Sequence, residues 1–306
     1  MTIPCTLYKA HGMGNDFAVF VDLEDSFAPE IKEVRAVCDR HFGLGADGLI
    51  RITLKLDPAE DTSYFFMDYY NQDGSIAKMC GNGVRVVAHI IELSGLHDFN
   101  ASPELEILTR AGVKTVEKVT SPDGDQLYRV DMGRFTIDAD TKHVVSGASS
   151  KSDDRVGNLV GEGLYVNMGN DHVVVECTEL FDTLSDENDT SRGDVLDLST
   201  DIDANIELIK VDAKNRSIDM RVVERGVGET LSCGTGICAA SVYASHIYGG
   251  DDWGVQVPGG NASTLIDGGR ISLEGPAKLV GKFYMVEDYL DDDSIKEILN
   301  GGEDVN

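Results

Sequence analysis

Two cysteines begin the same short motif in the two halves of the chain. Cys80-Gly81-Asn82-Gly83 resembles Cys233-Gly234-Thr235-Gly236, and about half of the 306 residues separate the two motifs. Each motif follows a glycine turn, Asp73-Gly74 or Gly226-Val227-Gly228, and precedes a run of small and apolar residues. This repeat predicts two related halves that face each other, with one cysteine from each half at a shared site.

Each cysteine also stands where a predicted helix begins. The free N–H groups and the dipole of a helix N-terminus lower the pKa of a thiol and bind anions. The glycines allow the backbone to approach a ligand closely. We therefore expect a ligand carboxylate to lie between two helix ends, where the same N–H donors would stabilise negative charge that develops on it.

Stereoinversion at a carbon atom requires such a pair of groups. One group removes a proton from one face of the carbon, and the other delivers a proton to the opposite face. A single nucleophilic cysteine is the alternative, but that chemistry requires a histidine base and a third group to orient it. The duplicated motif favours two acid/base cysteines. Neither interpretation needs a metal, and because the sequence offers no set of residues with metal-ligand spacing, we expect none.

Composition excludes several classes of function. The chain carries 54 acidic and 26 basic residues, a formal net charge of -28, which opposes unaided binding to nucleic acids or to an anionic membrane surface. No apolar run of about 18 residues is present to span a membrane. The N-terminus lacks the pattern of an export signal, so we expect a cytoplasmic protein. Acidic residues along the whole chain indicate a surface adapted to high salt, and an acidic protein without that adaptation is the alternative.

Apolar periodicity and turn residues predict the elements that carry the motifs. Helical spacing predicts helices over residues 29–38, 84–93 and 237–247. Short alternating or apolar stretches predict strands at residues 7–10, 17–21, 49–52, 64–70, 105–119, 127–132, within 164–177, and at 217–224, 254–257, 262–266 and 271–273. Residues 147–157 are predicted to form a loop. The acidic stretch 182–203 is predicted to be a solvated helix and loop without a special role.

Several longer motifs resemble those of the diaminopimelate epimerase family. They follow in order from residue 11 to about residue 285. They are His11-Gly12-Met13-Gly14-Asn15-Asp16-Phe17, Cys38-Asp39-Arg40-His41-Phe42-Gly43-Leu44-Gly45-Ala46-Asp47-Gly48, Asn71-Gln72-Asp73-Gly74, Met168-Gly169-Asn170-Asp171-His172, Glu224-Arg225-Gly226-Val227-Gly228-Glu229-Thr230, and the two cysteine motifs. This family interconverts LL- and meso-diaminopimelate in the pathway to lysine with a pair of cysteines and without pyridoxal phosphate. The resemblance therefore implies that the protein uses no cofactor.

The resemblance implies an α/β fold of two pseudo-symmetric halves. Each half would be a curved, mostly antiparallel sheet or barrel wrapped around a central helix. In the family the last strand returns to the first half. We therefore expect residues 1–125, with a return segment from about 275 to 306, to form the half that carries Cys80. Residues 126–274 would form the half that carries Cys233.

The resemblance also implies roles for individual residues. Cys80 and Cys233 would be the acid/base pair, and His172 an auxiliary residue near them. Gly81-Asn82 and Gly234-Thr235 would hold the reacting carboxylate, and Glu224-Arg225 would belong to the distal end of the site. The full set of expected substrate-binding residues is Asn15, Asn71, Gly81, Asn82, Asn170, Asn205, Glu224, Arg225, Gly234 and Thr235.

Some positions keep a structural alternative. Asn15, Asn71 and Asn170 adjoin Gly or Asp and are also typical of turns, and His172 is also compatible with a structural histidine. Gly48 departs from the family, whose members usually carry Gln there, and this removes one polar substrate contact.

Other functions remain as alternatives at this stage. A proline racemase or hydroxyproline epimerase would share the two-cysteine design, and a non-catalytic amino-acid-binding relative would share the fold. The expected partner is a small-molecule substrate, with a homodimer kept open as the assembly.

Overall fold

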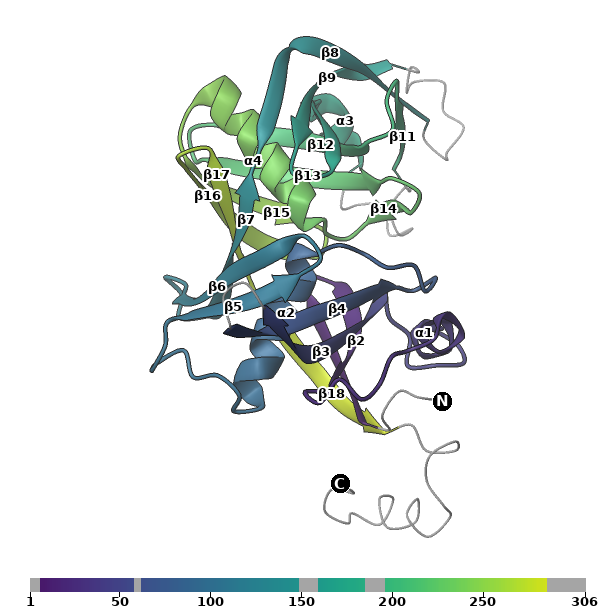
Figure 1. The fold of residues 1–306 in the computed structure, drawn as a ribbon. Coiled ribbons are helices and arrows are strands. Elements are labelled where there is room, and N and C mark those ends of the chain that lie inside the picture. Colours follow the sequence, from purple (N-terminus) through teal and green to yellow (C-terminus); the bar gives the residue numbers. More distant parts are fainter. Residues whose placement is uncertain (1–5, 58–61, 149–158, 185–195, 285–306) are drawn as a thin grey trace.

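A computed structural model describes residues 6–57, 62–148, 159–184 and 196–284. Its helices are α1 (Ile31–Cys38), α2 (Gly81–Leu93), α3 (Thr178–Leu184) and α4 (Gly234–Tyr248). Its strands are β1 (Thr6–Gly12), β2 (Asn15–Val21), β3 (Gly48–Asp57), β4 (Thr62–Asn71), β5 (Glu104–Thr109), β6 (Gly112–Thr120), β7 (Gln126–Arg134), β8 (Thr136–Ala148), β9 (Leu159–Asn167), β10 (Asp171–Glu176), β11 (Asp197–Thr200), β12 (Asn205–Asp212), β13 (Ser217–Glu224), β14 (Gly228–Thr230), β15 (Asp252–Val257), β16 (Gly260–Asp267), β17 (Arg270–Gly275) and β18 (Lys278–Tyr284). Hydrogen bonds connect these strands into one sheet, which folds into the two halves seen in Figure 1.

The first half consists of strands β1–β6 and β18 around α2. Helix α2 is buried along most of its length because apolar residues occur on nearly every face, among them Val84, Val87 and Ile91. Strand β18 pairs antiparallel with β1, from Thr6 opposite Tyr284 onward. The last described strand of the chain therefore lies in the sheet of the first half (Figure 1).

The second half consists of strands β8–β17 around α4. Small residues such as Ala239, Ala240 and Ser241 are fully buried and allow the strands to approach α4 closely. Strand β7 joins the halves, since it pairs with β6 through Val116 and Val130 and with β17 on its other edge. The sheet thus continues from β6 to β7 across the predicted domain boundary between residues 125 and 126. The division of the chain at that boundary stays a prediction.

Three sequence-based predictions of local structure need correction. The apolar pattern predicted helices that begin at residues 84 and 237. Helices α2 and α4 begin three residues earlier, at Gly81 and Gly234, because the glycine motifs themselves are helical. The acidic stretch 182–203 is not only helix and loop. Its residues Leu196 and Leu198 are buried, and β11 within it pairs with β8.

The predicted loop at 147–157 was wrong at its start, because Gly147 lies in β8 opposite Leu198. Residues 149–158 and 185–195 lie outside the described residues. Within the described part of the chain, no helix has the length and apolar character needed to cross a membrane.

Candidate active site

The two repeated cysteines occupy equivalent positions at the starts of the two central helices. Cys80 is the N-cap residue of α2 and Cys233 that of α4, both with extended backbone, and no side-chain hydrogen bond caps either helix. The first turns of the helices meet, since a Cβ atom placed on Gly234 would lie 3.5 Å from the Cα atom of Gly81. The glycines therefore permit two helix N-termini, each with a thiol, to converge.

Hydrogen bonds around Asn82 connect the first half to the second. The Cys80 thiol donates to Asn15 Oδ1 at 3.4 Å, and Asn82 Nδ2 donates to the same oxygen at 3.3 Å. Asn82 Nδ2 also lies 3.3 Å from the hydroxyl of Ser232, the residue before Cys233. Asn15 in turn donates to Asp47 at 2.9 Å. The structure thus brings Asn15, Cys80 and Asn82 together at the junction, and their expected role in catalysis and substrate binding stays a prediction.

A second group of expected site residues surrounds Cys233. The Cys233 Sγ and Thr235 Oγ1 atoms are 3.4 Å apart, and Asn170 Nδ2 donates to Thr235 Oγ1 at 3.3 Å. The thiol also lies within hydrogen-bonding reach of Glu224, a carboxylate that accepts a hydrogen bond from Thr230. Glu224 therefore lies at the cysteine end of the site, whereas the motif had suggested the distal end.

Three further expected site residues take no part in the hydrogen bonds described above around Asn82 and Cys233: Arg225, Asn205 and Asn71. The Arg225 guanidinium forms an exposed ion pair with Asp203 at 3.1 Å. Asn205 Oδ1 accepts from the backbone N–H of Arg225 at 2.9 Å, so this asparagine holds the segment that carries Glu224 and Arg225. Asn71 donates to Ser75 within a turn. None of these contacts involves Cys80 or Cys233, and the role of the three residues in substrate binding stays a prediction.

Burial changes the acidity that the helix termini alone would give the thiols. It raises the pKa of Cys80 to about 11, with a further contribution from the charge of Glu224, although the backbone N–H groups of Gly83 and Asn82 act in the opposite direction. Burial, followed by the charges of Glu224 and Glu207, raises the pKa of Cys233 well above its usual range. Both thiols are consequently protonated at neutral pH, because the cost of burying a thiolate exceeds the stabilisation from the helix N-terminus.

A buried acid–imidazole pair lies beneath the first turn of α4. His172 Nδ1 and Glu207 Oε1 are 2.6 Å apart, and neither side chain is exposed. A Cβ atom on Gly236 would lie 2.7 Å from Glu207 Oε1, so glycine is needed there to admit the carboxylate. Sequence reasoning missed Glu207, although an acidic residue within the apolar strand β12 was a detectable signal.

Arg85 is a second residue that sequence reasoning missed. It is fully buried in α2, where Nη2 donates to Asn82 Oδ1 at 2.5 Å and Nε donates to the Pro276 carbonyl at 3.4 Å. No carboxylate of the described residues pairs with it, and burial lowers its pKa to about 10. A Cβ atom on Gly12 would lie 3.3 Å from its Nη2 atom. The detectable signal was the one arginine within an apolar run.

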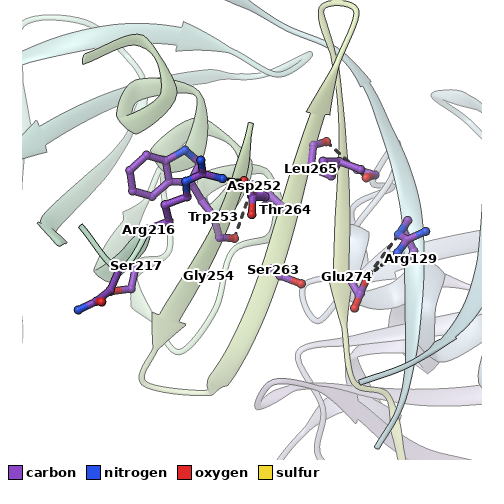
Figure 2. Close-up of a pocket in the computed structure, with 12 residues that line it drawn as sticks. Arg129, Arg216, Ser217, Asp252, Trp253, Gly254, Ser263, Thr264, Leu265 and Glu274 are labelled. Carbon is purple, nitrogen blue, oxygen red and sulfur yellow. Dashed lines mark hydrogen bonds and ion pairs between the residues drawn. The ribbon is translucent and has the colours of Figure 1, made fainter. Parts of the chain in front are cut away.

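A separate hollow of about 440 Å³ lies over β15–β17 and contains none of the expected site residues (Figure 2). Its charged side chains already pair with one another: Arg129 with Glu274 and Arg216 with Asp252. It therefore shows no unpaired charge that would recognise a ligand.

Solved structures with the same architecture define the fold class of the chain. A phenazine biosynthesis protein of the PhzF family from Bacillus anthracis matches with a TM-score of 0.64 and 15% identity, over 92% of this chain and 99% of that protein. A hydroxyproline epimerase from Agrobacterium vitis matches with a TM-score of 0.56 and 13% identity, over 92% of each chain. The predicted α/β fold class is therefore confirmed.

Sequence relatives narrow this class to one family. The family model for diaminopimelate epimerase matches residues 7–137 and 164–280. Diaminopimelate epimerases from Rhodococcus jostii and Thermobifida fusca are each 36% identical, covering 89% and 90% of this chain and 94% and 95% of the relatives. The chain belongs to the diaminopimelate epimerase family and is an isomerase.

Proposed function

We propose that the protein converts LL-2,6-diaminopimelate to meso-diaminopimelate with Cys80 and Cys233 as its two acid/base groups, in the pathway to lysine. The observation that carries this proposal is the convergence of two cysteine-capped helix N-termini, with Gly234 packed against Gly81. The names of the sequence relatives support the choice of diaminopimelate as the substrate.

The geometry suggests how each part of the site would act. Backbone N–H groups at the starts of α2 and α4 would hold the reacting carboxylate and stabilise the negative charge that develops on it when the adjacent carbon loses its proton. One cysteine, as the thiolate, would accept that proton on sulfur. The other, as the thiol, would deliver its proton to the opposite face of the carbon. Each turnover would leave the protonation states of the two cysteines exchanged.

Proton transfer must first produce a thiolate in a site that favours thiols. Glu224 is a candidate acceptor because it lies beside Cys233, and burial raises the pKa of its carboxyl group above the usual value. A carboxylate whose pKa is raised has a pKa closer to that of a thiol, and it therefore accepts a proton from the thiol more readily than an ordinary carboxylate does. Arg225 would be available to the distal carboxylate once its exposed ion pair with Asp203 opens, because exposed ion pairs contribute little stability.

Solvent hydrogen exchange tests the proposed function. The wild-type enzyme in deuterated water should incorporate deuterium at the α-carbon of diaminopimelate, detected by mass spectrometry. Cys80→Ala and Cys233→Ala should each lower epimerisation by about 10²–10⁴-fold, the usual contribution of an acid/base group. Cys177→Ser, a change to a cysteine outside the site, serves as the control and should remain active.

Two results would contradict the proposal. Wild-type turnover by either alanine variant would remove the two-cysteine mechanism. If the enzyme exchanged the α-hydrogen of proline or hydroxyproline in preference to that of diaminopimelate, the substrate assignment would be wrong and the racemase alternative would be favoured.

A further inference from the structure

Tyr69 is a buried tyrosine of β4 that the catalytic proposal does not use. Its side chain is 7% exposed, and its hydroxyl makes no hydrogen bond to the described residues. The neighbouring Tyr70 differs, because its hydroxyl donates to Asp68 at 3.1 Å. Its oxygen is not among the fully enclosed polar atoms that lack a partner, so the hydroxyl end of this buried side chain is open to a solvent molecule or a ligand. Tyr69 therefore offers a donor for which the described chain provides no acceptor.

Packing fixes the direction of this hydroxyl. The Tyr69 ring meets Phe17 edge to face, with centroids 5.7 Å apart and an interplanar angle of 79°. The ring also covers Gly48, where an added Cβ atom would lie 2.5 Å from Tyr69 Cε2. The absence of a side chain at Gly48 thus makes room for the ring. This is the position at which the family pattern has Gln.

The strands direct Tyr69 toward the cysteine site. Met67, Tyr69 and Asn71 share one face of β4 because alternate residues of a strand point the same way. Met67 packs against Gly83 in the first turn of α2, and a Cβ atom on Gly83 would also lie 3.5 Å from Cys80 Cβ. Asn71 is an expected substrate-binding residue. Tyr69 therefore lies between the start of α2 and Asn71.

The charges around Tyr69 keep its hydroxyl a neutral donor. Burial, followed by the charges of Cys80 once it is ionised, Asp47 and Glu224, raises the pKa of Tyr69 well above its usual value. A phenol that stays protonated can donate to a carboxylate at any pH at which the enzyme would work. Glu224 belongs to the second half of the chain, so the phenol is close to groups from both halves.

We propose that Tyr69, whose ring fills the space left by Gly48, is a substrate-binding residue whose hydroxyl donates a hydrogen bond to a carboxylate oxygen of the bound diamino diacid. This inference rests on the proposed function. Gly48 lacks the polar side chain that the family usually has there, so one substrate hydrogen bond is lost. Tyr69, on the adjacent strand, would replace that hydrogen bond.

Tyr69→Phe tests the inference, because it removes the hydroxyl and retains the ring. The variant should show kcat/KM for diaminopimelate lowered by about tenfold or more, mainly through a raised KM, as expected for a lost hydrogen bond to a charged group. Its melting temperature should be close to that of the wild type. Tyr70→Phe is the matched control, since it removes a hydroxyl from the opposite face of β4, and its kcat/KM should stay at the wild-type value.

Several outcomes would overturn the inference. If the wild type exchanges the α-hydrogen of diaminopimelate and Tyr69→Phe has the same kcat/KM, the proposed function stands and the role of Tyr69 is wrong. If the pH profile of Cys80 alkylation shifts in Tyr69→Phe, the hydroxyl acts on the thiol rather than on the substrate. If the wild type shows no exchange at all, the proposed function itself fails.

Discussion

The side-chain amide of Asn82 lies 3.3 Å from the hydroxyl of Ser232, although 150 residues separate them in the chain. Asn82 is two residues after one repeated cysteine, and Ser232 immediately precedes the other. This contact therefore links the two cysteine motifs directly. It makes the relative position of the thiols depend on the orientation of one amide group.

Arg85 sets that orientation, because its Nη2 atom donates to Asn82 Oδ1 at 2.5 Å and leaves Nδ2 to face Ser232. In Arg85→Lys the charge is kept, but one ammonium group cannot reproduce the separate contacts with Asn82 and the Pro276 carbonyl. We expect kcat/KM to fall by about tenfold or more. Steady-state kinetics, with thermal unfolding measured in parallel, check this. Full activity in Arg85→Lys would show that the amide orientation does not depend on the guanidinium.

Glu207 is expected to control the acidity of Cys233. Burial is the main cause of the raised pKa of that thiol and the negative charge of Glu207 adds to it, so the neutral variant Glu207→Gln should lower the pKa of Cys233. Alkylation of Cys233 at a fixed mildly alkaline pH should then become faster than in the wild type. Glu176→Gln, which changes an acidic residue in β10 that accepts a hydrogen bond from Tyr248, is the control. An unchanged alkylation profile in Glu207→Gln would exclude this electrostatic effect.

Cys80 should titrate at an unusually high pH. Its thiolate becomes the major form only near pH 11, so alkylation by iodoacetamide should accelerate with rising pH up to about that value. An ordinary thiol would reach its maximum rate just above a pKa of about 8.5. The rate can be followed by mass spectrometry of the Cys80 peptide. A plateau near the ordinary value would show that the helix N-terminus outweighs burial.

Salt should stabilise the folded protein. A net charge of -28 produces self-repulsion that ions screen, so the melting temperature should rise with potassium chloride over the molar range. Circular dichroism at several salt concentrations measures this, and an uncharged osmolyte at equal osmolarity is the control. A stable fold in low-salt buffer, with no gain from added salt, would contradict a salt-adapted surface.

The parts of the fold predicted correctly were those with a local or repeated signal. The two cysteine motifs showed that α2 and α4 are equivalent, and alternation marked most strands, such as β13. Glu207 escaped prediction because its partner His172 lies on another strand. Arg85 escaped because the Pro276 carbonyl comes from a distant segment, although its other partner, Asn82, lies in the same helix. The strand β11 escaped because the acidic residues of the stretch 182–203 concealed the alternation of Leu196 and Leu198.

The pairing of Thr6 with Tyr284 has a consequence for the synthesis of the protein. A ribosome must produce nearly the whole polypeptide before β1 can acquire β18 as a neighbour. Until then one edge of β1 is unpaired, and an open strand edge is a template for association with other chains. The first half to leave the ribosome is therefore the one that cannot finish its sheet until the end of translation.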